Sequence, residues 1–321
     1  MAIPTLLRHA VLCAGLLVAG AAPAETLTVH VDFAYYNPVS LVLKNKHWAE
    51  EALGPEVSVE WVQSAGSNKA LEFLNARSLD FGSTAGAAAL LGRANGNPIK
   101  AIYVYSKPEW TALVTRADSP IHTVADLAGK RVAVTRGTDP HIFLLRALAG
   151  AGLTEHDLKL VPLQHGDGRL ALDRGDVDAW AGLDPFMAQA ELESHDRLFF
   201  RDPDLNSYGV LNVREAFLAE HPDIVAKLVG AYERGRLWSL EHRAELAAIL
   251  AEASKLSPEV AARQLERTDL TNPALDDGPR RAIGAAGATL KASGIIAAET
   301  DTDAVLAALI EPRFSLLLAK K

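Results

Sequence analysis

Hydrophobic and polar residues alternate in short runs through the first two thirds of the chain, and each run leads into a segment of small residues. Residues 57–62 (VSVEWV) alternate as a strand does, QSAGSN follows at 63–68, and apolar residues then keep helical spacing to Arg77. The same order recurs with a short strand at 79–81, a loop of small residues at 82–86 and an Ala/Leu helix. Strands that alternate with helices in this way predict an α/β protein with largely parallel sheets.

Two further units repeat this order, and the last third of the chain is predicted to contain helices alone. A strand at 131–135 precedes a helix that begins at Pro140, and a strand at 177–181 precedes the segment LDPF at 183–186 and another helix. From Arg214 onward only helical spacing remains, including a helix after Ser257, which precedes Pro258 as a serine cap would.

Composition narrows the class of protein. The 321 residues are 49% hydrophobic and 22% charged, which is ordinary for a globular chain and excludes a disordered one. The net charge of −8 argues against a general nucleic-acid binder. With a single Cys, Cys13, the chain has neither a disulfide framework nor a Cys-built metal site. The ten His residues show no metal-binding spacing, and the nearest pair, His156 and His165, is interpreted as lying on the surface. We therefore expect no metal.

Residues 1–24 form a segment of their own. Arg8 precedes an apolar run at 10–22 that is too short to span a membrane stably, and Ala-Pro-Ala at 22–24 resembles a signal-peptidase site. We expect cleavage after Ala24 and export to the periplasm, which would remove Cys13. An N-terminal membrane anchor is the alternative.

The loops of glycine and hydroxyl residues carry the functional signal. Each is expected where a strand ends and a helix begins, so that backbone N–H groups and the positive helix end point toward it. In open α/β sheets, ligands bind beyond the carboxyl ends of the strands, where such loops gather. The loops therefore predict a site for a small anion, with no cofactor and no covalent chemistry. The alternative for each loop alone is that its glycines and hydroxyls only cap the helix and form the turn.

Five segments of the chain resemble one family of proteins. They are LDFGSTAG at 79–86, SPIHTVADLAGKRVAV at 119–134, GTDPH at 137–141, RGDVDAW at 174–180 and DPF at 184–186. In order and spacing they are similar to the solute-binding components of ABC importers for aliphatic sulfonates, taurine or nitrate. The likeness covers roughly residues 25 to 255.

The resemblance implies a two-lobed periplasmic-binding-protein fold of type II. Each lobe is a mostly parallel sheet flanked by helices, and two crossing strands join the lobes, near residues 110–115 and 206–212. Lobe 1 then comprises residues 25–110 and 210–321, the latter with the C-terminal helices. Lobe 2 comprises residues 111–209.

The resemblance also implies ligand-binding positions in both lobes. In lobe 1 they are Tyr36, Asn37, Ser64, Gly66, Ser67, Ser83 and Thr84. In lobe 2 and the second crossing they are Gly137, Thr138, Asp139, His141, Trp180, Asp184 and Tyr208. Relatives often carry Trp where this chain has Leu183, so the pocket lacks an aromatic side chain that is usual in the family.

Asp139 has two interpretations. Its carboxylate would cap the helix that begins at Pro140, or it would face the ligand and pair with an ammonium group. The second interpretation favours a ligand such as taurine, which carries a positive group beside its sulfonate.

The resemblance implies a binding function. The chain would capture a small oxyanion, an aliphatic sulfonate or taurine above all, by closing its lobes, and would act as a monomer. It would deliver the ligand to an ABC permease dimer whose ATPase subunits are separate chains, and it has no Walker motif of its own. A periplasmic ligand sensor is an alternative. An enzyme on the same fold is the other, although the desulfinases of this fold need a nucleophilic Cys that the mature chain lacks, and no GxSxG motif occurs.

Overall fold

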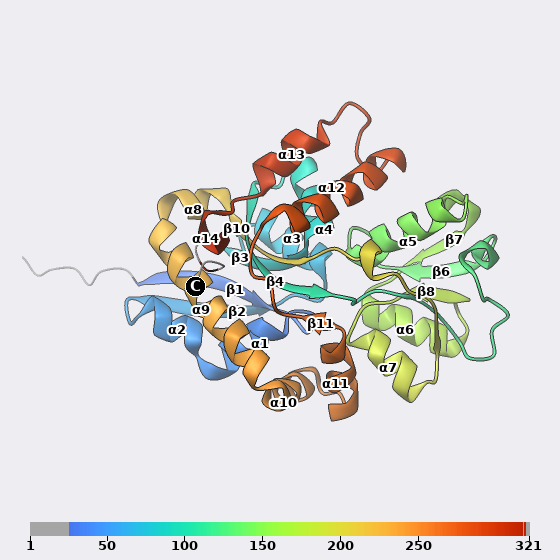
Figure 1. Ribbon diagram of the computed structural model, residues 1–321, viewed down its shortest axis with the longest axis horizontal. Coiled ribbons are helices and arrows are strands. Elements are labelled where there is room, and N and C mark those ends of the chain that lie inside the picture. Colours follow the sequence, from blue (N-terminus) through green and yellow to red (C-terminus); the bar gives the residue numbers. More distant parts are fainter. Residues whose placement is uncertain (1–25, 317, 319–321) are drawn as a thin grey trace, which may run out of the picture.

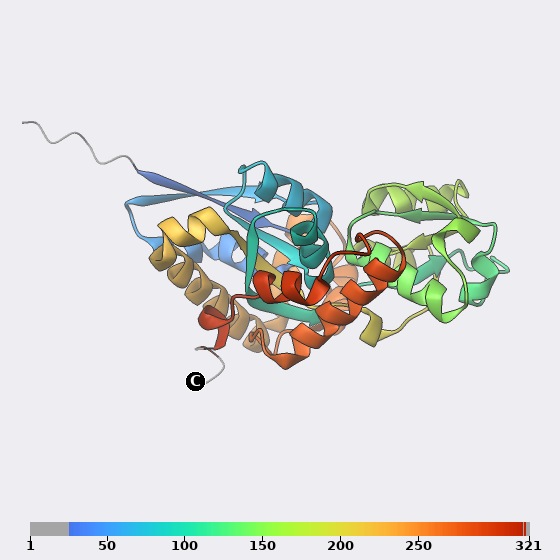
Figure 2. The ribbon, with the colours of Figure 1, turned by 90° about the horizontal axis from the view of Figure 1, so that it is seen from above.

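The computed structural model describes residues 26–316 and 318, which form two α/β parts (Figure 1). We call the part built on the six-stranded sheet lobe 1 and the part built on the five-stranded sheet lobe 2. Figure 1 shows lobe 2 in green at the right, and Figure 2 shows the same separation from above. The predicted signal peptide and Cys13 lie outside the described residues.

The sheet of lobe 1 has the order β11-β4-β10-β3-β1-β2. β1 pairs in parallel with β2 and β3, whereas β10 lies antiparallel between β3 and β4 and the edge strand β11 is antiparallel to β4. Its strands are β1 (Leu27–Phe33), β2 (Val57–Gln63), β3 (Phe81–Ala85), β4 (Ile99–Pro108), β10 (Gly209–Arg214) and β11 (Thr268–Asp269).

The sheet of lobe 2 has the order β7-β6-β8-β5-β9. β6 is parallel to β7 and β8, and β5 is antiparallel to β8 and β9. In each sheet the strand on which the chain arrives from the other lobe, β5 or β10, is antiparallel to both of its neighbours. The predicted two-lobed α/β fold is confirmed, and each of its two sheets is mixed, with parallel and antiparallel pairs. The strands are β5 (Leu113–Thr115), β6 (Arg131–Val134), β7 (Lys159–Pro162), β8 (Ala179–Ala181) and β9 (Arg197–Phe200).

Helices flank both sheets (Figure 1). The helices within the alternating part of the chain are α1 (Pro38–Lys46), α2 (Trp48–Leu53), α3 (Ser67–Asn75), α4 (Gly86–Ala94), α5 (Asp139–Gly150), α6 (His165–Arg174) and α7 (Phe186–Glu193). Short 3₁₀ turns are η1 (Val124–Leu127), η2 (Glu155–Asp157) and η3 (Pro203–Leu205).

The last third of the chain is helical, as predicted, except for β11. Ser257 caps its helix as expected, because its Oγ accepts a hydrogen bond from the N–H of Val260 at 3.3 Å. These helices are α8 (Glu215–Glu220), α9 (Pro222–Glu241), α10 (Arg243–Ser254), α11 (Pro258–Glu266), α12 (Asp277–Ala292), α13 (Thr302–Leu309) and α14 (Arg313–Leu316).

The segment at 82–86, predicted as a loop, is instead most of strand β3. All five residues of β3 are buried between β1 and β10. Gly82 allows α3 to approach, since a Cβ there would lie only 2.8 Å from the Leu74 side chain. Small and hydroxyl residues therefore serve close packing here, and the loop prediction was wrong.

The chain passes from lobe 1 to lobe 2 between Pro108 and Leu113 and returns between Phe200 and Gly209. The two crossings touch each other, because the N–H of Thr111 donates to Oδ1 of Asn206 at 3.0 Å. The division of the lobes at residues 110 and 209 stays a prediction.

The lobes also pack against each other through helices. A buried cluster joins α4 and α12 of lobe 1 to α5 of lobe 2, and we call it the apolar seam. Its members are Ala87, Leu91, Ile142, Leu145, Ala286, Leu290 and Ile296. Within residues 26–316 and 318, no helix has the length and hydrophobicity needed to cross a membrane.

Candidate functional site

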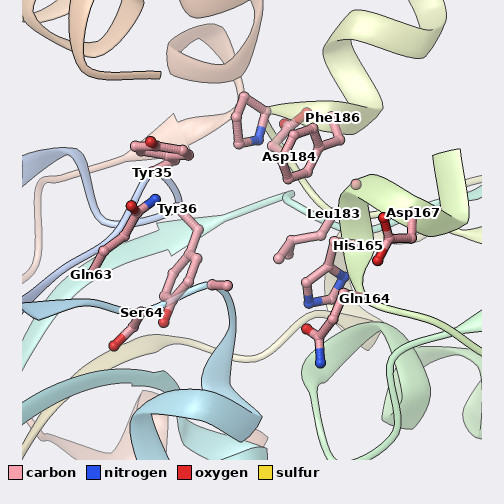
Figure 3. Close-up of a pocket in the computed structure, with 13 residues that line it drawn as sticks. Tyr35, Tyr36, Gln63, Ser64, Gln164, His165, Asp167, Leu183, Asp184 and Phe186 are labelled. Carbon is pink, nitrogen blue, oxygen red and sulfur yellow. The ribbon is translucent and has the colours of Figure 1, made fainter. Parts of the chain in front are cut away.

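A cavity of about 200 Å³ lies between the two lobes (Figure 3). From lobe 1 it is lined by Tyr35, Tyr36, Gln63, Ser64 and Ala65. From lobe 2 it is lined by Gln164, His165, Gly166, Asp167, Leu183, Asp184, Pro185 and Phe186. A volume of this size suits a small solute and is below the range of drug-sized pockets, which begins at about 300 Å³.

Four strand ends supply these residues. The lobe 1 residues follow β1 and β2, and the lobe 2 residues follow β7 and β8. The cavity thus lies beyond the carboxyl ends of strands that run parallel within their lobes, which is where open α/β sheets bind ligands. The loops at these ends lead into α1, α3, α6 and α7.

Tyr36 forms a wall of the cavity and is held from behind. Its hydroxyl donates to the carbonyl oxygen of Ser83 at 2.9 Å, and its ring meets that of Trp110 edge-on at 6.0 Å. The next residue, Asn37, is fully buried, and its Nδ2 donates to Oγ of Ser83 at 2.7 Å. Ser83 of β3 therefore positions this loop without lining the cavity.

A buried carboxylate, Asp32 of β1, lies in the same network. Its two oxygens accept hydrogen bonds from the backbone N–H and the hydroxyl of Ser83, both at 2.8 Å. Burial raises the pKa of Asp32 to about 6, against the hydrogen bonds from Ser83 and Ser64, which lower it. The apolar strand VHVDF, interrupted by one Asp, is the signal in the sequence that could have identified this residue.

His165 opens α6 and lies on the lobe 2 side of the cavity. It is only 1% exposed, so the interpretation of His165 as a surface residue was wrong. Its Nδ1 lies 3.1 Å from Oγ1 of Thr135, and its Nε2 is buried with no hydrogen-bond partner among the described residues. Burial lowers the pKa of His165 to about 3, so the ring is neutral at physiological pH.

Close packing on Trp180 seats the first turn of α6. A Cβ on Gly168 would lie 2.7 Å from Nε1 of Trp180, so only glycine lets the helix rest on this ring. Trp180 itself is fully buried in β8 and does not line the cavity. It packs against Gly168 of α6, whereas the family resemblance implied contact with the ligand.

Asp184 lines the cavity and also connects the lobes. Its Oδ1 accepts a hydrogen bond from the N–H of Ala188 at 2.9 Å, and its Oδ2 lies 3.3 Å from Nε of Arg267, a lobe 1 residue. Burial raises the pKa of Asp184 to about 6, although Arg267 opposes the shift. Glu191 of α7 adds ion pairs to Arg263 at 3.0 Å and to Arg267 at 3.1 Å. These pairs hold α7 against α11.

The cavity holds no fixed cation, since none of its lining residues is Lys or Arg. Donors for an anion come instead from the first turn of α6, whose residues His165, Gly166 and Asp167 line the cavity and whose first N–H groups have no partner within the helix. This helix has no side-chain cap. Its backbone N–H groups and the positive end of its dipole can hold a small anion.

The structure brings together only part of the predicted site. Tyr36, Ser64 and Asp184 line the cavity, and Gly66 lies beside it, where a Cβ would come within 3.0 Å of His165 Nε2. Four predicted residues of lobe 1 lie behind the cavity in hydrogen bonds of their own, and they are Asn37, Ser67, Ser83 and Thr84. Tyr208 lies at another surface hollow beside α12.

The predicted residues at the start of α5 do not line the cavity. Thr138 donates to the carbonyl oxygen of Thr135 at 2.6 Å, and His141 lies 3.4 Å from Glu155 and from the N–H of Gly137. Burial lowers the pKa of His141. The cavity uses α6 and α7 of lobe 2 where the sequence suggested α5 and α7.

Asp139 has a role that neither interpretation anticipated. Thr138 is the N-cap residue of α5, so Asp139 does not cap the helix. Its Oδ2 accepts hydrogen bonds from Nε1 of Trp110 at 2.7 Å and from the N–H of Ser207 at 2.9 Å. Its Oδ1 accepts from Oγ of Ser207 at 2.9 Å. The carboxylate thus ties α5 to both crossings of the chain, and it is absent from the cavity lining.

The loop at 164–167 was not among the predicted site segments. The signal was present, because QHGDG follows the strand at 159–162 just as other glycine-rich segments follow theirs. No cluster of three or more His, Cys, Asp or Glu residues able to hold a metal occurs in the part of the chain that the structure describes.

The two-lobed architecture with an inter-lobe cavity defines the periplasmic-binding-protein fold, and solved structures share it. The alkanesulfonate-binding protein SsuA from Xanthomonas axonopodis pv. citri, solved with MOPS, gives a TM-score of 0.80 at 24% identity, covering 90% of this chain and 99% of that chain. SsuA from Escherichia coli, a periplasmic aliphatic sulphonate binding protein, gives 0.76 at 25% identity, with coverages of 89% and 92%. A desulfurization enzyme, DSZB, gives 0.66 at 17% identity, so the fold alone does not separate binding from catalysis.

The sequence model of the NMT1/THI5-like family matches residues 54–246, and the chain belongs to this family. A relative from Escherichia coli K12 that carries the name of an aliphatic sulfonates-binding protein is 36% identical over 200 residues, or 62% of this chain. The match spans 60% of that relative's length. These findings confirm the family resemblance described from the sequence.

Proposed function

We propose that the protein is the substrate-binding component of an ABC importer and captures a small aliphatic sulfonate between its lobes. The observation that carries this proposal is the cavity itself, which both lobes line and to which the uncapped first turn of α6 contributes His165, Gly166 and Asp167. The names of the relatives, which are binding proteins for sulfonates, support the choice of anion.

Binding proceeds by closure. The sulfonate oxygens accept hydrogen bonds from backbone N–H groups of both lobes, so the ligand favours the closed arrangement over the open one. The pairs of Glu191 with Arg263 and Arg267 join the lobes in the same arrangement. No bond of the ligand is broken, and the protein acts as a carrier that is not an enzyme.

The partners of this function are a permease dimer and separate ATPase subunits, and the chain acts as a monomer in the periplasm after cleavage at Ala24. Mass spectrometry of the periplasmic fraction tests the location. A mature chain that begins at Glu25 is expected, and an intact N-terminus in the membrane fraction would contradict it.

A ligand panel tests the binding function. The mature protein is heated with ethanesulfonate, 1-propanesulfonate, taurine, sulfate, nitrate or propionate, and its melting temperature is recorded. A ligand at 100 times its dissociation constant stabilises the native state by about 2.7 kcal/mol, which is readily measured. We expect sulfonates to raise the melting temperature more than propionate does.

Two glycine variants show whether the effect comes from the cavity. Gly166→Leu places a side chain in the cavity, whereas Gly150→Leu changes a glycine near the end of α5 with no atom within 4 Å of its Cβ position. We expect Gly166→Leu alone to abolish the ligand shift. Equal shifts in both variants, or no response to any sulfonate, would refute the proposed function, and turnover of a sulfonate would favour an enzyme.

A further inference from the structure

Trp110 lies on the first crossing and contacts both walls of the cavity from behind, without lining it. Its ring meets the ring of Tyr36, on the lobe 1 wall, edge-on at 6.0 Å. Its carbonyl oxygen accepts a hydrogen bond at 2.9 Å from the N–H of Asp184, on the lobe 2 wall. The side chain is 3% exposed and belongs to the same buried cluster as Leu183, which stands across the cavity from Tyr36 (Figure 3). One residue of the crossing therefore touches residues of both walls.

The indole N–H ties Trp110 to lobe 2. Its Nε1 donates at 2.7 Å to Oδ2 of Asp139, at the start of α5. The same carboxylate holds the second crossing, because it accepts hydrogen bonds from the N–H and the hydroxyl of Ser207, both at 2.9 Å. Asp139 is buried, and hydrogen bonds to a charged acceptor are stronger than those between neutral groups. The orientation of the indole ring is thus fixed by α5 together with both crossings.

The position of the Tyr36 side chain depends on contacts that belong to different lobes. Its hydroxyl donates to the carbonyl oxygen of Ser83, in the sheet of lobe 1, and its ring edge meets the indole of Trp110. The ring of Tyr105, also in lobe 1, packs against the same indole at 6.4 Å. The indole itself is bonded to lobe 2 through Asp139. A rotation of lobe 2 that carries this bond with it therefore moves the indole against Tyr36.

We propose that Trp110 is a positioning residue for ligand capture: through its bond to Asp139 it places the Tyr36 wall of the cavity according to the arrangement of the lobes. This inference rests on the proposed binding function, because it requires a ligand in this cavity. The bond of the indole favours the closed arrangement, in which both walls contact one ligand. Without the bond, a smaller fraction of the protein is competent to bind, and the apparent affinity falls by the same factor.

Trp110→Phe tests the inference, because it removes the N–H donor and keeps an aromatic ring beside Tyr36. Trp61→Phe is the matched control: Nε1 of Trp61 also donates to a carboxylate, that of Glu50 at 2.8 Å, and neither residue lines the cavity. Isothermal titration with ethanesulfonate measures the affinity of each protein. Tryptophan fluorescence, recorded with and without ethanesulfonate, gives a spectroscopic signature of the indole, and circular dichroism shows whether each variant is folded.

We expect ethanesulfonate to change the tryptophan emission of the wild type and of Trp61→Phe, and Trp110→Phe to lose most of this change. The affinity of Trp110→Phe should fall about tenfold, as expected for the loss of a hydrogen bond to a charged group, while that of Trp61→Phe stays within about twofold. A ring that serves packing alone would lower the melting temperature and leave both readouts as they are. A full ligand-induced emission change in Trp110→Phe, or an affinity equal to that of the wild type, would overturn the assignment while leaving the binding function intact.

A double variant tests whether the effect passes through Asp139. In the Asp139→Ala background, Trp110→Phe should lower the affinity for ethanesulfonate by less than about threefold, because the acceptor is already absent. A tenfold loss in that background would mean that the indole acts through another contact, and the proposal would be wrong. If Trp110→Phe does not fold, Asp139→Asn takes its place, since it keeps the indole and weakens the acceptor; it should lower the affinity about threefold, and an unchanged affinity would overturn the proposal. If the wild type binds none of the sulfonates, the proposed function fails and the inference falls with it.

Discussion

Replacing Asp139 by Ala should destabilise the protein at the junction of its lobes. The substitution removes the acceptor of three hydrogen bonds, one from Trp110 in the first crossing and two from Ser207 in the second. Asp139 is 2% exposed, so water does not readily replace the carboxylate. The three donors are left buried and unpaired.

The magnitude follows from two opposing effects. Each unpaired buried donor costs about 1–3 kcal/mol. The Ala variant no longer buries a negative charge, and this offsets part of the loss. In the wild type, burial of that charge is unfavourable and raises the pKa of Asp139. Since removing one partner from a buried charged network typically costs about 3–5 kcal/mol, we expect a loss near the lower end, about 3 kcal/mol. For a chain of this size the melting temperature should fall by about 6 °C.

Urea unfolding, followed by tryptophan fluorescence and circular dichroism, measures this loss. Asp118→Ala is the control, because the Asp118 side chain is 79% exposed and its pairing with Arg116 is a surface one. A loss below about 1 kcal/mol, or one no larger than that of Asp118→Ala, would refute the reasoning. Asp139→Ala should also lower the affinities for taurine and ethanesulfonate by the same factor. A selective loss of affinity for taurine would support the interpretation that Asp139 contacts the ligand.

Three further predictions concern the cavity, a buried acid and the contact between the lobes. Gly66→Ala should weaken ligand binding about tenfold in calorimetry, because the added Cβ would lie 2.8 Å from Oδ1 of Asn68 and 3.0 Å from Nε2 of His165, a residue of the other lobe. The pKa of Asp32 in the folded protein is about 6, above the ordinary 3.8, so the protonated carboxyl favours folding and the ionised one opposes it. As the pH rises from 4 to 7, the unfolding free energy of the wild type, measured by urea titration, should therefore fall by about 2 kcal/mol relative to that of Asp32→Asn. Glu191→Gln should weaken binding about threefold at low salt and little at high salt, since its ion pairs are partly exposed.

Each of these predictions has a result that would contradict it. Gly230→Ala, in α9 with no atom within 4 Å of the added Cβ, is the control for Gly66→Ala, and equal affinities for the two variants would argue against close contact between the lobes. Parallel pH profiles of the wild type and Asp32→Asn would mean that this carboxylate does not titrate in the expected window. A salt-independent effect of Glu191→Gln would point to altered packing of α7.

The sequence predicted the fold better than the site, for physical reasons visible in particular segments. Alternation identified β2 because its side chains face different surroundings on the two sides of the sheet. Residues 82–85 of β3 were predicted as a loop because this strand is buried on both sides and consists mostly of small residues, which are also typical of loops. Gly, Ser and Thr allow neighbouring segments to approach closely, both in a loop and in a buried strand.

The composition of the site depends on contacts between distant segments. Thr135 and His165 are thirty residues apart, and no local pattern shows that Oγ1 of Thr135 lies 3.1 Å from Nδ1 of His165. In the same way, Asp139 precedes a helix as a cap would, and only the position of Ser207 in the folded chain draws its carboxylate away. A buried charge needs hydrogen-bond partners, and these tertiary contacts outweigh the local preference of Asp for a helix cap.

The apolar seam between α5 and the pair α4 and α12 makes the motion of the lobes measurable by heat capacity. None of its residues lines the cavity, so a ligand does not touch it. A short sulfonate has little hydrocarbon of its own to dehydrate. A strongly negative heat capacity change on binding would therefore report that Ile142 and Leu145 leave water when the lobes come together. A value near zero would identify this contact as a fixed pivot, which stays dry with and without ligand.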